Sequence, residues 1–328
     1  MGPSVAVEPA RLEERAPAFR LIFQHLTANE REQRVATALH LVERGELDPA
    51  GLLVARQGGV VGAMLCQVLP GASGLVWPPQ TVLAAGQREW EDLLVRRAVD
   101  WMRRQGAKLG QALMSLREAP LAAPLVRNGF AHITRLSYLR RLLSPSDRPP
   151  PVARRLTCQS YDCCDQALFH RTLLRTYEDT LDCPEISDVR DLDEVIAGHR
   201  AQGKHDPALW WLARDGDRPI GVLLLTEMPE WEAWDVSYVG VVPEARRCGL
   251  GRELMIHALT EAQAAGVSQM TLSVDDRNRP AWHLYRSLGF EPYDQREVYL
   301  AVWEKGNLRI TPSDTHPEGR EGQSPVCS

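Results

Sequence analysis

The features that mark membrane-bound, secreted or nucleic-acid-binding proteins are missing from this sequence. No apolar run approaches the ~18 residues of a membrane-spanning helix, and the first residues show neither the basic nor the apolar segment of a secretion signal. Lysine and arginine number 38 against 43 acidic residues, so the net charge of −5 provides no basic excess for nucleic acid or anionic lipid. We therefore expect a cytoplasmic protein, monomeric or homodimeric, without nucleic-acid or membrane partners.

Cysteines and histidines at metal-ligand spacing are also missing. The seven cysteines are an odd number, and no two of them have the two-residue spacing of zinc or redox motifs. His170, His257 and His283 lie on predicted helices without a second ligand at a suitable spacing. We expect reduced thiols and no bound metal.

The sequence does contain an internal repeat. Its 328 residues correspond to about two domains, and its 44% hydrophobic and 25% charged residues are typical of folded chains. Residues 52–69 and 209–228 each predict a β-hairpin, with two apolar strands around a glycine-containing turn. A second pair of landmarks, Gly129 and Gly289, recurs at nearly the same offset, which indicates a duplication.

Proline-rich and low-complexity segments set the expected boundaries. The segment SPSDRPPP at 144–151 breaks any periodicity and favours an extended spacer. We expect a first domain at 1–145, a Pro-rich linker at 146–151, a second domain at 152–305 and a disordered tail at 306–328.

Helices and strands alternate along the second half. The apolar patterns predict helices at 165–177 and 188–202, the hairpin at 209–228, strands at 234–242, 270–274 and 296–303, and helices at 251–265 and 280–288. Strands separated by helices need crossover connections, so we expect an α/β fold with a mixed sheet and helices on its faces.

A glycine-rich turn joins one of these strands to the next helix. Residues 239–254 read VGVVPEARRCGLGREL, and backbone N–H groups at such a turn and helix N-terminus favour a pyrophosphate. A dinucleotide fingerprint needs a third glycine where Leu254 stands, and the Gly-Lys-Ser or Gly-Lys-Thr of a Walker loop is absent. A plain strand-to-helix turn with solvated arginines remains the alternative.

Two motifs carry a resemblance to a known family. Arg246-x-x-Gly249-x-Gly251, directly after a strand that ends Val-x-Pro, resembles the acetyl-CoA-binding motif of the GNAT acetyltransferase superfamily. The run from Asn278 through Leu-Tyr to Gly-Phe, in which Tyr285 stands, is similar to the second signature of that family. The resemblance implies an α/β chain of tandem GNAT folds, each a mixed, mostly antiparallel sheet flanked by helices, with 152–305 as the catalytic N-acetyltransferase domain.

The resemblance also implies roles for particular residues. Acetyl-CoA would be the cosubstrate, bound by the strand and turn residues Val239, Gly240, Val241, Arg246, Arg247, Cys248, Gly249, Leu250, Gly251 and Arg252, and by Asn278 and Tyr285. Tyr285 would give a proton to the coenzyme A sulfur, and a core tyrosine is the alternative.

Asp235 is the residue that we expect to act as the base, directly or through a water. Relatives often have a carboxylate at this position on the strand before the turn, and strand alternation predicts Asp235 on one face with Val239 and Val241. The position on the next strand, where some relatives have a carboxylate, holds Ser273. A solvated carboxylate at the end of a strand is the alternative for Asp235.

The first half has lost these motifs. The corresponding stretch 75–97 contains no Arg-x-x-Gly-x-Gly, and Leu125-Val126 stand in place of Leu-Tyr. We therefore expect a degenerate GNAT-like domain that supports the second half or lines its acceptor site. The tandem layout is similar to that of the mycothiol synthases within the superfamily.

The acceptor is expected to be a primary amine of a small molecule or peptide, attacked directly in a ternary complex. The segments 177–188 and 227–235 are acidic, and the second includes Trp231 and Trp234, a combination that favours a cationic amine. Solvated loops are the alternative for these segments. For the whole chain the alternatives are an acetyl-CoA-binding regulatory protein of weak activity, a mycothiol-synthase-like acetyltransferase and a structural scaffold.

Overall fold

A computed structural model describes residues 6–82, 85–144, 156–303 and 308–309. The predicted linker at 146–151 lies outside the described residues. Of the predicted tail, only 308–309 are described, and they pair with the strand that ends at Trp303. In the parts of the chain that are described, no helix combines the length and the apolar character needed to cross a membrane.

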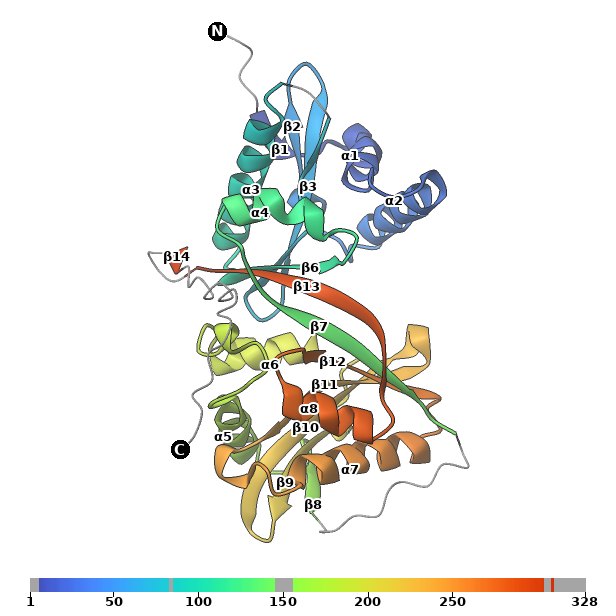
Figure 1. The fold of residues 1–328 in the computed structure, drawn as a ribbon, viewed down its shortest axis with the longest axis vertical. Coiled ribbons are helices and arrows are strands. Elements are labelled where there is room, and N and C mark those ends of the chain that lie inside the picture. The colour runs from blue at the N-terminus through green and yellow to red at the C-terminus, as the bar shows by residue number, and fades with distance from the viewer. Residues whose placement is uncertain (1–5, 83–84, 145–155, 304–307, 310–328) are drawn as a thin grey trace, which may run out of the picture.

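The two halves have the same order of elements, as the duplication predicts, except that β4 and β5 of the first half stand where the second has β11, and that β14 follows only the second half (Figure 1). The first half consists of β1 (Ala6–Pro9), α1 (Arg15–Ile22), α2 (Ala28–Glu43), β2 (Leu52–Arg56), β3 (Val60–Leu69), β4 (Ser73–Val76), β5 (Gln80–Thr81), α3 (Gln87–Arg104), β6 (Leu109–Ser115), α4 (Ala123–Arg127) and β7 (Ala131–Leu142). The second half consists of β8 (Thr157–Ser160), α5 (Gln166–Tyr177), α6 (Leu192–Arg200), β9 (Trp210–Asp215), β10 (Arg218–Met228), β11 (Ala233–Val241), α7 (Leu250–Ala264), β12 (Gln269–Asp275), α8 (Arg279–Ser287) and β13 (Glu291–Trp303), followed by β14 (Leu308–Arg309).

The predicted elements of the second half are all present, and two boundaries differ clearly. The strand expected at 296–303 already begins at Glu291, because residues 291–295 pair with β7. The helix expected at 188–202 begins only at Leu192, because Asp191 caps it through the backbone N–H of Glu194, and the Glu194 side chain accepts from the backbone of Asp191. Asp188 lies outside the helix with a φ of 64°, in the left-handed region.

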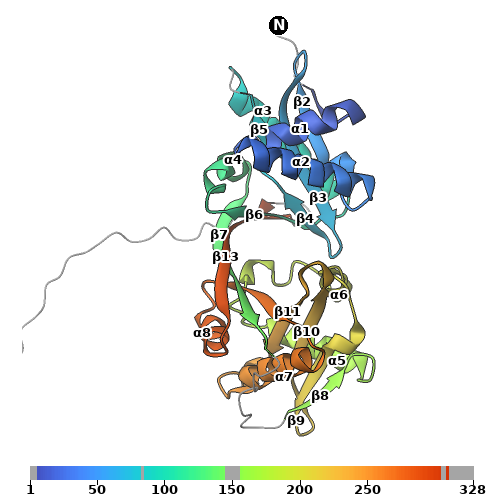
Figure 2. The ribbon, with the colours of Figure 1, turned by 90° about the vertical axis from the view of Figure 1, so that its right-hand side faces the viewer.

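The last strands of the two halves are exchanged. The sheet order is β1-β2-β3-β4-β6-β13-β7-β12-β11-β10-β9-β8, so β13 of the second half lies between β6 and β7 of the first. Reciprocally, β7 of the first half lies between β12 and β13 of the second. Figures 1 and 2 show β7 and β13 as long strands that run between the two lobes. The limits predicted from the duplication stay a prediction, but each lobe of the sheet is completed by a strand from the other half.

Helices cover both faces of the sheet in each lobe, which confirms the mixed α/β architecture. In the second lobe, one buried cluster packs β10, β11 and β12 against α7 and α8, and includes Leu223, Leu254 and Tyr285. A second cluster packs the other face against α5 and α6, and includes Phe169 and Trp210. The candidate site lies where two neighbouring strands of this sheet, β11 and β12, stop pairing, between the helices on the two faces.

Candidate active site

The glycine turn has the geometry of an open helix N-terminus. Gly249 is the N-cap of α7 with a φ of 83°, which L-residues with a side chain rarely adopt. A Cβ added at Gly249 would meet no atom within 4 Å, and one added at Gly251 would meet only Leu284 and Val241, at 3.7 and 3.8 Å. Packing inside the protein therefore gives no reason for a bare backbone at Gly251, whereas an anion held at the helix N-terminus does.

Arg246 is used differently from the other predicted coenzyme residues. Its guanidinium donates to four backbone carbonyls, those of Thr176, Glu178, Asp179 and Val241, at 2.6 to 3.1 Å. These bonds tie the segment after α5 to the end of β11. Arg246 thus positions the turn, and any contact of its side chain with a phosphate stays a prediction.

Apart from Leu250, the rest of the turn leaves its side chains outside the core. Arg247 has a φ of 61°, Cys248 and Gly249 are exposed, and Leu250 is buried under the start of α7. Arg252, also on α7, donates to the Ser287 hydroxyl at the end of α8, at 2.8 Å. The backbone of the turn is therefore the part that an incoming phosphate can reach.

The strands β11 and β12 separate next to this turn. They pair in parallel only from Ala233 to Asp235, and beyond the pair of Asp235 with Thr271 they diverge. We call this divergence the fork. The N–H of Val242 donates to β10, and successive N–H groups of a strand alternate between its two edges, so those of Val241 and Val239 point into the fork.

Packing inside the protein explains why residue 240 is a glycine. A Cβ there would lie 2.6 Å from the Thr176 side chain and from the Tyr238 hydroxyl, so glycine lets α5 approach the strand. By the same alternation, the N–H of Gly240 faces β10 and not the fork.

The prediction that Asp235 shares a face with Val239 and Val241 is wrong. A β-bulge leaves Ser237 without a partner on β10, so Asp235 pairs with Thr226 while Val239 pairs with Leu223. Thr226 and Leu223 are three residues apart on β10 and therefore point to opposite faces. Asp235 lies on the face covered by α5 and α6, and the side chains of Val239 and Val241 lie on the face covered by α7.

Asp235 stands at the base of the fork in a polar setting. Its Oδ1 accepts a 2.6 Å hydrogen bond from the Thr271 hydroxyl. Burial raises the pKa of Asp235 to about 6, although this hydrogen bond acts in the opposite direction. A carboxyl with a pKa near neutrality is well suited to take and return a proton.

Tyr285 lies on α8, in the buried cluster that packs this helix and α7 against β11 and β12. Asn278 caps this helix by accepting from the N–H of Ala281 at 3.3 Å, which gives Asn278 a structural role besides its predicted contact with coenzyme. The Tyr285 side chain is only 7% exposed, and its hydroxyl takes part in none of the hydrogen bonds found among the described residues. Burial and the negative charge of Asp182 raise its pKa, so the hydroxyl stays protonated.

The structure corrects one position in the first half. The N–H of Phe130 donates to Leu125 as that of Phe290 donates to Tyr285, so Leu125, and not Val126, is the counterpart of Tyr285. Leu125 is fully buried, while Val126 is 50% exposed. The α4 segment is one residue shorter than α8 before its Gly-Phe, which is why reading from the Leu-Tyr pair missed the shift.

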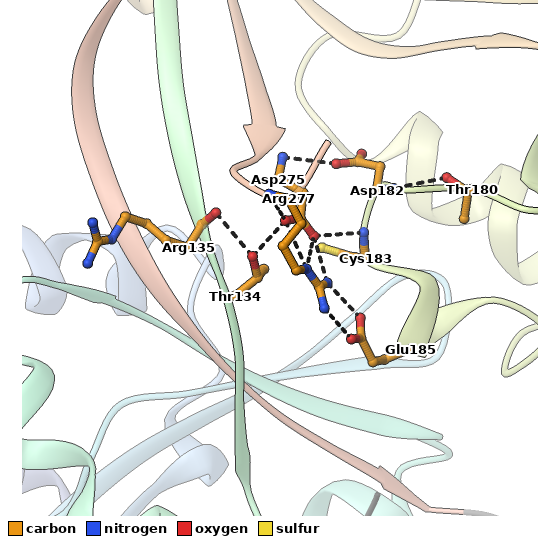
Figure 3. Close-up of polar contacts among 8 residues, drawn as sticks. All are labelled: Thr134, Arg135, Thr180, Asp182, Cys183, Glu185, Asp275 and Arg277. Carbon is orange, nitrogen blue, oxygen red and sulfur yellow. Dashed lines mark hydrogen bonds and ion pairs between the residues drawn. The ribbon is translucent and has the colours of Figure 1, made fainter. Parts of the chain in front are cut away.

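Two acidic segments are expected at the acceptor site, and of these the first, 177–188, is the one that contacts a strand of the fork. Glu227, Glu232 and Trp234 line a shallow pocket beside 265–268, at the end of β11 away from the glycine turn. The segment after α5 instead reaches the fork through Asp182 (Figure 3).

Asp275, the partner of Asp182, is not among the site residues predicted from the sequence. Asp275, at the end of β12, is fully buried and donates its N–H to Asp182 Oδ1 at 3.0 Å. The signal in the sequence was the run Asp275-Asp276-Arg277 directly after an apolar strand, where acidic residues and an arginine meet at the end of a β-strand.

A forked sheet with an open glycine turn on one side and a buried tyrosine on the other belongs to a mixed α/β fold of the GNAT class. A sequence profile of the acetyltransferase (GNAT) family matches residues 173–290. In the solved structures, a GCN5-related N-acetyltransferase from Sphaerobacter thermophilus superimposes with a TM-score of 0.56 at 18% identity, covering 92% of this chain and 96% of that one. A glucosamine N-acetyltransferase region of a fungal multi-domain β-N-acetylglucosaminidase gives a TM-score of 0.59 at 14% identity, over 92% of this chain and 38% of that one.

Sequence comparison with curated proteins points to the same family. The mycothiol acetyltransferase of Segniliparus rotundus is 31% identical over 225 residues, which cover 63% of this chain and 77% of that protein. The mycothiol acetyltransferase of Thermomonospora curvata is 33% identical over 183 residues, 55% of this chain, and the match spans 60% of that relative. The chain belongs to the GNAT acetyltransferase family.

Proposed function

We propose that this protein is an acetyl-CoA-dependent N-acetyltransferase whose active site lies in the fork of the second half. One observation carries the proposal: the bare helix N-terminus at Gly249 and Gly251 opens beside the N–H groups of Val239 and Val241, which face the fork. The turn would hold the pyrophosphate, and the edge of β11 would pair with the pantetheine arm. No metal takes part in the proposed reaction.

In the proposed reaction the free amine attacks the thioester carbonyl carbon. The C–N bond forms, and the negative charge on the carbonyl oxygen is met by an N–H of β11. The amine proton passes to Asp235 through water, and collapse of the tetrahedral intermediate breaks the C–S bond. Tyr285 supports the departing sulfur with its protonated hydroxyl. The absence of a protein partner for this hydroxyl, among the described residues, favours an enzyme over a protein that only binds acetyl-CoA.

For the acceptor, we propose the amine that carries the acetyl group in mycothiol. The support is the name shared by the curated relatives, mycothiol acetyltransferase, and the sequence match that extends into both halves of one of them. The substrate would then be desacetyl mycothiol together with acetyl-CoA.

Calorimetry and a product assay test the proposal. We expect one acetyl-CoA site per chain and an acetylated product of desacetyl mycothiol, detected by its added acetyl mass. Gly249→Asp should abolish binding, because the aspartate would place a negative charge at the proposed phosphate position. A stoichiometry of two, or retained binding in Gly249→Asp, would contradict the assignment of the site to the second half.

A further inference from the structure

Asp182 is placed on the wall of the fork by an interaction that the first half helps to build. Its Oδ1 accepts from the N–H of Asp275, on β12 beyond the point where β11 and β12 stop pairing. In return, the Asp275 carboxylate accepts from the N–H of Cys183 at 3.1 Å. The Thr134 hydroxyl, on the exchanged strand β7, donates to Asp275 Oδ1 at 2.6 Å (Figure 3). The segment after α5 is thus fastened to β12 and, through it, to β7.

The charges of this cluster are unevenly compensated. Arg277 pairs with Asp275 at 2.7 Å and with Glu185 at 2.6 Å. Burial alone would raise the pKa of Asp275, but the donors from Arg277 and Thr134 outweigh it, so its pKa lies below the usual value. Asp182 has no ion pair in the described part of the chain. Crowding by protein around its carboxylate and the charge of Asp275 raise its pKa.

A second polar atom points to a ligand at the same place. Tyr285 is only 7% exposed, but its hydroxyl is not among the side-chain atoms closed off from solvent, and it has no hydrogen-bond partner among the described residues. The charge of Asp182 contributes to the raised pKa of this hydroxyl. The second oxygen of Asp182, Oδ2, likewise accepts no hydrogen bond in the described structure. Both groups therefore have hydrogen-bonding capacity that the protein leaves unused and that a molecule with hydrogen-bond donors could take up.

We propose that Asp182 binds the ammonium group of the acceptor, and that Thr134 of the first half positions it through Asp275. The inference rests on the proposed function, since it places the acceptor beside the tyrosine that faces the thioester sulfur. Asp182 is exposed, so an incoming ammonium group can reach its uncompensated carboxylate and form a charge-assisted hydrogen bond with it. The degenerate half would thereby contribute to acceptor binding through a strand that it lends to the other lobe.

A metal ion is a poorer occupant than an ammonium group. Ligand atoms of Asp182, Cys183 and Asp275 lie within 4.8 Å of one another. However, both oxygens of Asp275 already accept hydrogen bonds, from Thr134, Arg277 and Cys183, and Arg277 brings a positive charge to the same spot. Burial raises the pKa of Cys183, so its thiol stays protonated, and of the three residues only Asp182 has a carboxylate left to offer a cation.

The variant Asp182→Asn tests this role without removing the bond to β12, because an asparagine Oδ1 can still accept from Asp275. With desacetyl mycothiol as acceptor, we expect KM for the amine to rise at least tenfold. We expect kcat at saturation to change less than threefold, with acetyl-CoA affinity unchanged. The matched control is Asp188→Asn, which removes a charge from an exposed residue of the same segment. An unchanged KM in Asp182→Asn, or an equal rise in Asp188→Asn, would overturn the proposal.

The positioning role of Thr134 has a test of its own. Thr134→Val keeps the shape and loses the hydroxyl, and we expect KM for the amine to rise about threefold or more with the Tm lowered only slightly. Thr134→Ser restores the donor and should return KM to the wild-type value. A serine variant that behaves like the valine variant, or a valine variant with unchanged KM, would remove Thr134 from acceptor binding.

A probe that needs no turnover separates this inference from the proposed function. Ethylammonium chloride is titrated into the coenzyme A-saturated protein while the ring signal of Tyr285, assigned with Tyr285→Phe, is followed by NMR with labelled tyrosine. A saturable shift is expected for wild type and Asp188→Asn, none for Asp182→Asn, and none with ethanol, the neutral analogue. If no acetyl transfer occurs but this pattern is seen, the proposed acceptor or reaction fails and the ammonium site stands. If transfer occurs and the pattern is absent, the ammonium site fails.

Discussion

The turns that begin α3 and α7 are built alike, yet only one is open. Gly86 caps α3 with a φ of 90°, and Gly249 caps α7 with a φ of 83°. A Cβ at Gly86 would meet the ring of Trp90 at 3.4 Å, whereas one at Gly249 would meet nothing within 4 Å. Two residues into each helix stand Arg88 and Gly251. The first half has kept the backbone of the turn and filled the space beside it.

The strands before the two turns also differ, in the backbone N–H groups that they can offer to a ligand. Gly62 pairs with Ala55 and Thr81, and Gly221 pairs with Ala213 and Val241, which makes Thr81 the counterpart of Val241. Two residues earlier in each half, Pro79 is therefore the counterpart of Val239. Proline has no N–H, so the first half lacks the donor that the second half points into its fork. If only the second half binds coenzyme, as proposed, the first half differs from it in the strand as well as in the turn.

Transferring the arginine of the first half to the second should have the largest effect. In Gly251→Arg the side chain would occupy the open space at the helix N-terminus, and we expect no measurable acetyl-CoA binding by calorimetry. Gly59→Arg adds the same charge in an exposed hairpin turn with free space and should bind normally. Retained affinity in Gly251→Arg would show that the open turn is not the coenzyme site.

Transferring the proline removes a single donor. Because the N–H of Val239 faces the fork and not β10, Val239→Pro should fold and lower kcat/KM by roughly 10²–10³, the range for loss of one oxyanion donor. Val239→Ala keeps the N–H and should stay near wild type in the same kinetic assay. Equal losses in both variants would trace the effect to the side chain of Val239.

Removing the Tyr285 hydroxyl should have the next largest effect, a loss of kcat. Tyr285→Phe is expected to lower kcat by about 10², as general acids do, and to leave acetyl-CoA affinity nearly unchanged. Tyr299→Phe, a buried tyrosine of β13 on the side of the first lobe, serves as the control in steady-state kinetics. A normal kcat for Tyr285→Phe would make Tyr285 a packing residue, as Leu125 is in the first half.

Replacing Asp235 should change the pH dependence of kcat/KM. A base with a pKa of about 6 works when deprotonated, so wild-type kcat/KM should rise as pH increases through 6. Asp235→Asn should lack this rise, lose about tenfold or more at neutral pH, and recover as alkaline pH supplies free amine. Asp217→Asn, in an exposed turn, should follow wild type. Parallel profiles of Asp235→Asn and wild type would transfer the base role to another group.

The smallest effect concerns stability. In the protein without coenzyme, Gly251→Ala should raise the free energy of unfolding by up to about 1 kcal/mol, since alanine favours helix and its Cβ meets only ordinary contacts. The same variant should weaken acetyl-CoA binding. Gly249→Ala should instead lower stability by about 1 kcal/mol because of its positive φ. Denaturant unfolding measures both, and a destabilised Gly251→Ala would mean that the glycine serves the fold.

The sequence predicted most of the local structure and the two motifs of the site. The turn at 246–251 and the cap at Asn278 depend on neighbouring residues, so their glycines, proline and asparagine could be read directly. Alternation along β11 was read correctly up to the bulge, and a single unpaired residue, Ser237, then reversed the faces of Asp235 and Val239. Nothing in a periodic pattern indicates which strand carries an extra residue.

By itself, the sequence determined the order of helices and strands, the duplication, and which half keeps an open turn, because each depends on residues close together in the chain. Only the tertiary structure decided that β7 and β13 change places, and that Asp182 and Thr134 meet at Asp275. The contact of Thr134 with Asp275, for example, joins residues 141 positions apart. They form when the whole sheet assembles, since strand partners are selected by pairing and burial across both halves and not by the local pattern of either strand.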